Sequence, residues 1–163
     1  MRVEQLKMSE LVEFDSECGL VRFANERALI FDATATGNLS KELVESFGSA
    51  TARAVLTRFG YTQGWRLASA TENLFQWESE PDWQEACGRL LMLSGMYHMG
   101  SRTPGSPTKD GLTVLGSYEA EQHLAQQGKS ETPVCWTLCG MMSGYLSRSM
   151  NMEIYVLEDR CAG

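Results

Sequence analysis

The chain is organised around its C-terminal run, Thr132 to Gly163, which contains the small-residue stretch Cys139-Gly140-Met141-Met142-Ser143-Gly144-Tyr145. As a helix, this stretch carries little bulk, so its backbone can come close to another element, another subunit or a ligand. Cys135 precedes it and Cys161 follows a predicted strand after it, so two of the five cysteines stand at the ends of a helix-then-strand unit. This combination favours a sensor held by its thiolates over an enzyme.

The composition is that of one soluble domain. At 163 residues the chain can bury a core without disulfides or metals, and its hydrophobic content of 43% is ordinary. Residues 1–11 lack the apolar core of a signal peptide, so we expect a cytoplasmic protein. In that compartment the cysteines are core residues, reactive thiols or metal ligands before they are disulfides.

Charge and hydropathy exclude two classes of partner. The formal net charge of -7 argues against direct nucleic-acid binding, because such surfaces carry a basic patch or stripe. No apolar run approaches the roughly 20 residues that a membrane span needs. We expect neither nucleic acid nor membrane to bind this chain.

The first half of the chain predicts short strands followed by helices. Residues 11–15 and 20–23 alternate apolar with polar around a turn at Gly19, and 28–31 predicts a third strand. Helical spacing then begins at Thr36 and ends at Gly48. A small antiparallel sheet therefore precedes the helices.

The helical pattern resumes at Ser49 and continues toward Leu74, although Gly60 and Gly64 interrupt it. These glycines mark a kink or a close contact between helices. A third helix opens at 79–83, with Pro81 in its first turn. Its apolar stripe is made of Trp83, Ala86, Cys87, Leu90 and Leu91.

The second half mixes helices with short strands. Strands are predicted over 96–99, 112–115 and 152–157, and helices over 117–128 and 132–150. This order, strands then helices then strands, predicts an α+β fold.

Short motifs spread in order over nearly the whole chain resemble those of a known family. They are Leu43-Val-Glu-Ser-Phe-Gly48, Ala52-Arg53, Arg58-Phe-Gly-Tyr61 with Gly64, Ser117-Tyr-Glu-Ala-Glu with His123, Pro133-Val-Cys-Trp136, Ser143-Gly-Tyr145, and Glu158 with Cys161. The set is similar to the N-terminal sensory domain of bacterial sigma-54-dependent transcriptional activators of the XylR/DmpR type, with its vinyl-reductase-like half.

The resemblance implies a role and a domain organisation. The family's domain binds a small aromatic effector and thereby relieves repression of a following ATPase domain. This chain has neither a Gly-x-x-x-x-Gly-Lys-Ser/Thr motif nor a basic helix-turn-helix, so residues 1–163 look like the sensory region alone. The resemblance divides it into a dimerisation-type half, 1–78, and a ligand-binding half, 79–163, and implies a homodimer.

The resemblance also implies zinc. The family's ligands map onto Cys135, Glu158 and Cys161, and the fourth would lie beyond Gly163. Thiolates and a carboxylate suit zinc, and the dipole of the following helix would stabilise a thiolate at Cys135. Cys139, one helical turn later, is a substitute ligand or a core residue. We expect weak or incomplete zinc binding.

An effector pocket is implied as well, with its polar anchors replaced. The His and Trp that hold a phenol hydroxyl in relatives fall at Leu91 and Val114, so an effector more apolar than phenol is expected. Tyr97 and His98 could supply a displaced polar contact. The alternative is that Leu91, Leu93, Leu112 and Val114 are plain core residues. The predicted lining is Leu91, Leu93, Leu112, Val114, Tyr145 and Val156.

Catalytic signals are weak. The only histidines are His98 and His123, and no serine lies in a Gly-x-Ser-x-Gly motif. A Cys135–His123 pair is conceivable. Glu119 and Glu121, beside His123, are expected on the exposed face of a helix. The sequence therefore predicts no enzyme, and the alternative to a sensor is a stand-alone vinyl-reductase-like binding or adaptor module.

Overall fold

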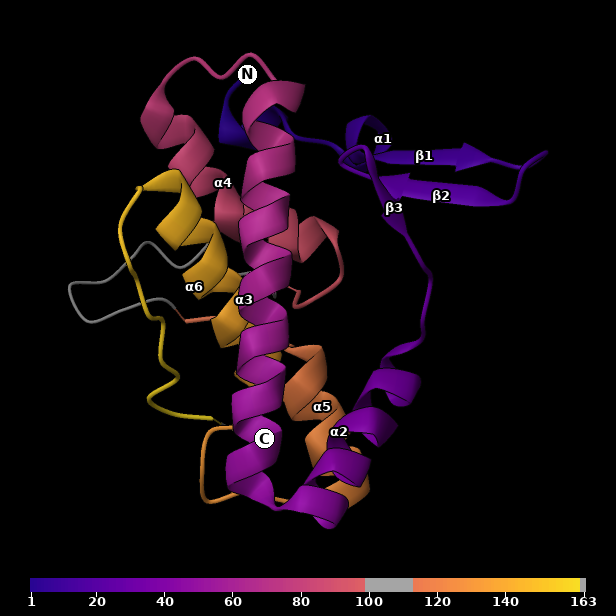
Figure 1. Cartoon of the computed structure of the whole chain (residues 1–163), viewed down its shortest axis with the longest axis vertical. Coiled ribbons are helices and arrows are strands. Elements are labelled where there is room, and N and C mark those ends of the chain that lie inside the picture. Colours follow the sequence, from indigo (N-terminus) through magenta and orange to yellow (C-terminus); the bar gives the residue numbers. More distant parts are fainter. Residues whose placement is uncertain (99–112, 162–163) are drawn as a thin grey trace.

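The computed structural model describes residues 1–98 and 113–161 and confirms the α+β fold. Figure 1 shows the helix α3 running along the long axis of the molecule, with α4 and α6 nearby and a small sheet projecting to one side. Within the described residues, none of the helices has the length and hydropathy that crossing a bilayer requires.

The N-terminal elements are η1 (Val3–Gln5), α1 (Met8–Leu11), β1 (Val12–Asp15), β2 (Leu20–Phe23) and β3 (Glu26–Ala28). The strands form one antiparallel sheet in the order β1-β2-β3. The predicted hairpin is confirmed.

The turn of this hairpin uses the residues that the sequence indicated. Gly19 has a φ of +65°, and the Asp15 carboxylate accepts the N–H of Cys18 at 3.0 Å. The predicted third strand over 28–31 is wrong except at Ala28. The turn at Ala24 and Asn25 is so short that pairing begins with Glu26 opposite Phe23, and the chain has left the sheet after Ala28.

The two long helices are α2 (Ala33–Phe47) and α3 (Ser49–Leu74), separated by Gly48 with a φ of +79°. The first begins three residues before the predicted Thr36, because the Asp32 carboxylate accepts the Ala35 N–H at 2.7 Å. The second is one continuous helix, so its glycines do not break it.

Those glycines mark the close helix contact instead. A β-carbon placed on Gly64 would lie 1.9 Å from the carbonyl oxygen of Met141, and one on Gly144 would lie 2.0 Å from that of Tyr61. Gly60 and Gly140 have the same relation to backbone on the opposite helix, each at 2.2 Å. The small residues between Cys139 and Tyr145 therefore let the backbone of α6 (Trp136–Ser149) contact the backbone of α3 directly.

The helix α4 (Glu80–Leu93) follows its prediction closely. Ser79 caps it by accepting the Asp82 N–H, Pro81 lies in its first turn, and the whole predicted stripe is buried. The stripe joins one hydrophobic core with Leu6 and Leu11 from the N-terminal segment and Tyr145 from α6. Both halves of the chain share this core.

The helix α5 (Tyr118–Gln127) ends at Gly128 as predicted, whereas α6 starts later than the predicted 132. Its first free N–H groups, those of Cys135, Thr137 and Leu138, are accepted by carboxylates from distant parts of the chain. The start of α6 is therefore set by tertiary contacts.

The predicted strand over 152–157 is wrong. Among the described residues this segment pairs with no strand, and its backbone bonds instead to serine hydroxyls of α6. Ser147 exchanges two hydrogen bonds with the backbone of Ile154, and Ser143 accepts the Val156 N–H at 2.8 Å. Of the strands predicted over 96–99 and 112–115, only a His98–Leu115 bridge is seen, and residues 99–112 lie outside the described residues.

Candidate functional site

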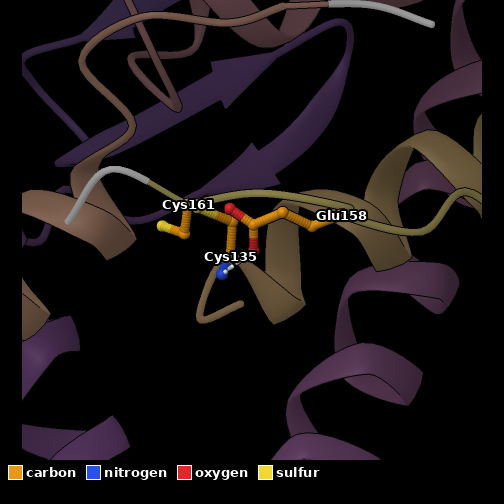
Figure 2. A group of neighbouring side chains, drawn as sticks. All are labelled: Cys135, Glu158 and Cys161. Carbon is orange, nitrogen blue, oxygen red and sulfur yellow. Dashed lines mark hydrogen bonds between the residues drawn. The ribbon is translucent and has the colours of Figure 1, made fainter. Parts of the chain in front are cut away.

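Three predicted metal ligands come together where the C-terminal segment crosses the start of α6. One ligand atom each from Cys135, Glu158 and Cys161 lies within 4.8 Å of the others. Figure 2 shows Glu158 and Cys161 approaching Cys135 from the same segment. Cys135 is buried and the other two are partly buried.

Hydrogen bonds fix this arrangement before any metal is considered. The Cys135 N–H donates to Glu158 Oε2 at 2.8 Å, and the Cys135 thiol donates to Ser117 Oγ at 3.3 Å. The serine contacts of Ile154 and Val156 set the register of the segment two residues before Glu158. The fold thus delivers all three side chains to one place.

The electrostatics differ from the sequence-based expectation. Burial, with further contributions from the charges of Glu158 and Cys161, raises the pKa of the Cys135 thiol. Without a cation, this raised pKa keeps the thiol protonated near pH 7.

The donor set nevertheless fits zinc. Zinc takes thiolate and carboxylate ligands with bonds of about 2.0 to 2.3 Å, and a bound cation deprotonates a coordinating thiol. A spread below 4.8 Å needs little movement to close on an ion. Cys139 is not in this group of described residues, and burial raises its pKa to about 11.

Five of the six predicted effector residues belong to one hydrophobic cluster. Leu91 and Tyr145 are completely buried there, and the others are partly buried. Leu112 lies outside the described residues. The partly buried members are Leu93, Val114 and Val156.

The hydroxyl groups near this cluster are already paired, whereas the buried Trp83 Nε1 within it has no hydrogen-bond partner among the described residues. The Tyr145 hydroxyl donates to the Trp83 carbonyl at 2.8 Å, and the Tyr97 hydroxyl donates to the Gly88 carbonyl at 2.6 Å. His98 is exposed and lies 3.5 Å from Glu121. A ligand in the cluster would therefore meet mainly carbon from Leu91, Val114 and Tyr145, and the Trp83 indole N–H is a donor without a partner in the described part of the chain.

Sequence reasoning missed a second feature, a cavity of about 480 Å³ bounded by α2, α3, α5 and α6. Glu119 lines it and was wrongly expected on an exposed face. Its carboxylate accepts the N–H groups of Thr137 and Leu138, both at 2.8 Å, and burial raises its pKa to about 7. No pattern in the sequence predicts hydrogen bonds from Glu119 to Thr137 and Leu138, which lie 18 and 19 positions further along the chain.

The conceivable Cys135–His123 pair has other partners. The Cys135 thiol donates to Ser117, whereas the His123 ring lies 3.2 Å from the Gln127 amide. Neither contact activates the thiol as a nucleophile.

A comparison with known protein families identifies the family of this chain. Residues 7–103 match the family model described as "Activator of aromatic catabolism". The chain belongs to this family. The predicted resemblance to XylR-type sensory domains is thereby confirmed.

Two curated relatives align with nearly the whole chain. The phenol regulator MopR of Acinetobacter guillouiae is 30% identical over 156 residues, 92% of this chain. The transcriptional regulatory protein XylR of Pseudomonas putida is 26% identical over 161 residues, 96% of this chain. The chain spans only 28% of the length of each.

A solved structure shows the same fold. The phenol-responsive sensory domain of the transcription activator PoxR, crystallised with phenol, superposes with a TM-score of 0.82 at 24% identity. The match covers 94% of this chain and 79% of that one.

Proposed function

We propose that this chain is the effector-sensing domain of a cytoplasmic sigma-54-dependent transcriptional activator and that it catalyses no reaction. One observation carries the proposal: the family match covers residues 7–103, and the shared fold covers 94% of the chain. In the parent protein the domain would control a following ATPase domain. ATP hydrolysis that depends on effector in the longer protein would test this role, and hydrolysis indifferent to every aromatic effector would contradict it.

The effector site we propose is the cluster around Leu91, Val114 and Tyr145. Neither Leu91 nor Val114 can donate a hydrogen bond, and the Tyr145 hydroxyl already serves Trp83. An unpaired phenolic hydroxyl costs about 1 to 3 kcal/mol, roughly ten- to hundredfold in affinity. An alkylbenzene or biphenyl should therefore bind more tightly than phenol.

Calorimetric titration with toluene, biphenyl and phenol tests this preference. The informative variant is Val114→His, which returns a hydrogen-bonding side chain to the partly buried wall and should improve phenol relative to toluene. Val12→His, on the strand β1 and outside both the cluster and the cavity between α2, α3, α5 and α6, is the control. Tighter binding of phenol than of toluene by the unmodified chain would sink the proposed specificity.

We also propose that Cys135, Glu158 and Cys161 hold zinc, with weaker affinity than a four-ligand site. Zinc would supply no chemistry here beyond holding the C-terminal segment against α6. We expect zinc that dissociates during dialysis against a chelator, and its loss in Cys135→Ser but not in Cys18→Ser, whose thiol is exposed. One zinc per chain that survives the chelator would contradict weak binding.

The N-terminal half, residues 1–78, is our proposed dimerisation half, and 79–163 the ligand-binding half. Leu29, Ile30 and Phe31 form an apolar run between the sheet and α2 whose side chains are 68%, 75% and 68% exposed. Sedimentation should show a dimer that Ile30→Ser weakens. Leu157→Ser is the control, because Leu157 is also 75% exposed; equal effects of both changes would contradict this surface.

A further inference from the structure

The cavity between α2, α3, α5 and α6 is separate from the proposed effector cluster. Its volume of about 480 Å³ is within the range of about 300 to 1,000 Å³ that is typical of small-molecule sites. No lining residue belongs to the predicted effector set. Figure 1 shows α2 and α5 near the end of α3 that lies away from α4.

The wall of this cavity is mainly apolar and comes from several elements. Leu43 of α2 and Leu56 and Phe59 of α3 face it, and Trp136 covers it from the first turn of α6. Leu56 and Trp136 belong to a small hydrophobic cluster distinct from the main core. An aromatic ring or alkyl chain would fit this wall without losing hydrogen bonds.

The lining is one-sided in charge when Glu119 is ionised, a state that an adjacent ammonium favours because an opposite charge stabilises the carboxylate. Glu119 is its only acidic residue, and no Lys or Arg is among the described residues that line it. His123 does not offset this charge, because burial lowers its pKa and keeps the ring neutral near pH 7. The Glu119 oxygens each accept one backbone N–H and retain further lone pairs.

We propose that this cavity is a second ligand site, which binds a small apolar amine with its ammonium against Glu119 and its ring or chain against Leu56, Phe59 and Trp136. A cation is the complement of a lone carboxylate in an apolar wall, because it supplies both the charge and the hydrogen-bond donors. An anion of the same shape would be repelled. The site is independent of the effector specificity proposed above.

Glu119 also connects this site to α6. Its carboxylate holds the N–H groups of Thr137 and Leu138, next to Cys135 at the start of the same helix. A bound amine would therefore contact the group that fixes the N-terminal turn of α6.

Calorimetry on the full chain with benzylamine, toluene and benzoate tests the proposal, since the three probes share a ring and differ in charge. The amine should be selected over toluene in this cavity by about tenfold or more, since a charged hydrogen bond contributes that much, and benzoate should not bind there. Amide NMR locates the site: benzylamine should shift Thr137 and Leu138, whereas toluene in the effector cluster should shift the surroundings of Tyr145.

Glu119→Gln should remove the preference for benzylamine while keeping one acceptor oxygen for α6. Glu121→Gln is its control, because Glu121 lies on the same helix, is 57% exposed and does not line the cavity. Should Glu119→Gln fail to fold, Ser40→Trp fills the cavity from α2 and should abolish amine binding with the helical circular dichroism unchanged.

Three results would overturn the proposal. They are benzylamine binding no tighter than toluene at this site, equal amine affinity in a folded Glu119→Gln, and shifts confined to the surroundings of Tyr145. If benzylamine fails to bind and Ser40→Trp changes the sedimentation of the chain, the cavity is a contact between two copies and the proposal is wrong.

Discussion

Gly64→Ala tests the contact on which the fold depends, the backbone approach of α3 to α6. The added β-carbon would lie 1.9 Å from the Met141 carbonyl oxygen, whereas ordinary contact begins at 3.4 Å. The obstacle is backbone rather than the end of a flexible side chain, so the two helices have to separate by the difference, about 1.5 Å.

The cost follows from that separation. A gap of about 0.5 to 1 Å already forfeits a quarter to a half of the dispersion energy of the atoms that line it, and overpacking a core typically costs about 1 to 3 kcal/mol. Alanine recovers about 1 kcal/mol of helix propensity. Because the contact is backbone to backbone, we place the gross cost near 3 kcal/mol and the net loss near 2 kcal/mol, roughly 4 to 8 °C in Tm.

Thermal and urea unfolding followed by circular dichroism, at one fixed zinc concentration, measures this loss. Gly88→Ala is the matched control, since Gly88 lies inside α4 and its β-carbon would meet only the Tyr97 hydroxyl, at 3.2 Å. We expect this control to stay within about 1 kcal/mol of the unmodified chain. A Gly64→Ala protein as stable as the control would refute the close contact.

Three further predictions concern buried polar groups. Tyr145→Phe removes one hydrogen bond to the Trp83 carbonyl, which keeps its partner within α4, and should cost about 0.5 to 1.5 kcal/mol in urea unfolding; an unchanged midpoint would mean that the hydroxyl is dispensable. Iodoacetamide at pH 8 should modify exposed Cys18 well before Cys87, whose pKa burial raises to about 12; equal rates by mass spectrometry would contradict this burial. Burial raises the pKa of Glu119 from about 4.5 to about 7, so its stabilising contribution is present below pH 4.5 and is lost as pH rises through 7. Tm should therefore fall more steeply over this window in the unmodified chain than in Glu119→Gln, and parallel curves would show that Glu119 does not titrate there.

Local signals in the sequence were enough for the elements that carry their own boundaries. Ser79 and Pro81 start α4, Gly48 separates α2 from α3, and Gly19 turns the hairpin, because each acts on backbone within a few residues. The apolar stripe of α4 was likewise predicted, since helical spacing fixes which side chains share a face.

Only the tertiary structure decided what those elements contact. The small residues of 139–145 predicted a close approach but not its partner, which is the pair Gly60 and Gly64 on α3. Alternation over 152–157 predicted a strand. In the structure, the hydroxyls of Ser147 and Ser143 accept the N–H groups of Ile154 and Val156, which a neighbouring strand would otherwise pair.

The candidate sites divide in the same way. The resemblance named Cys135, Glu158 and Cys161, and the fold brings them within 4.8 Å because the serine contacts set the register of the last segment. Glu119 had no signal, because its partners are the free N–H groups of a helix 18 residues away. The sequence by itself determined the elements and the family, through short-range backbone chemistry and ordered motifs. Tertiary structure decided the helix contact, the start of α6 and the second cavity, because each depends on groups that are distant along the chain.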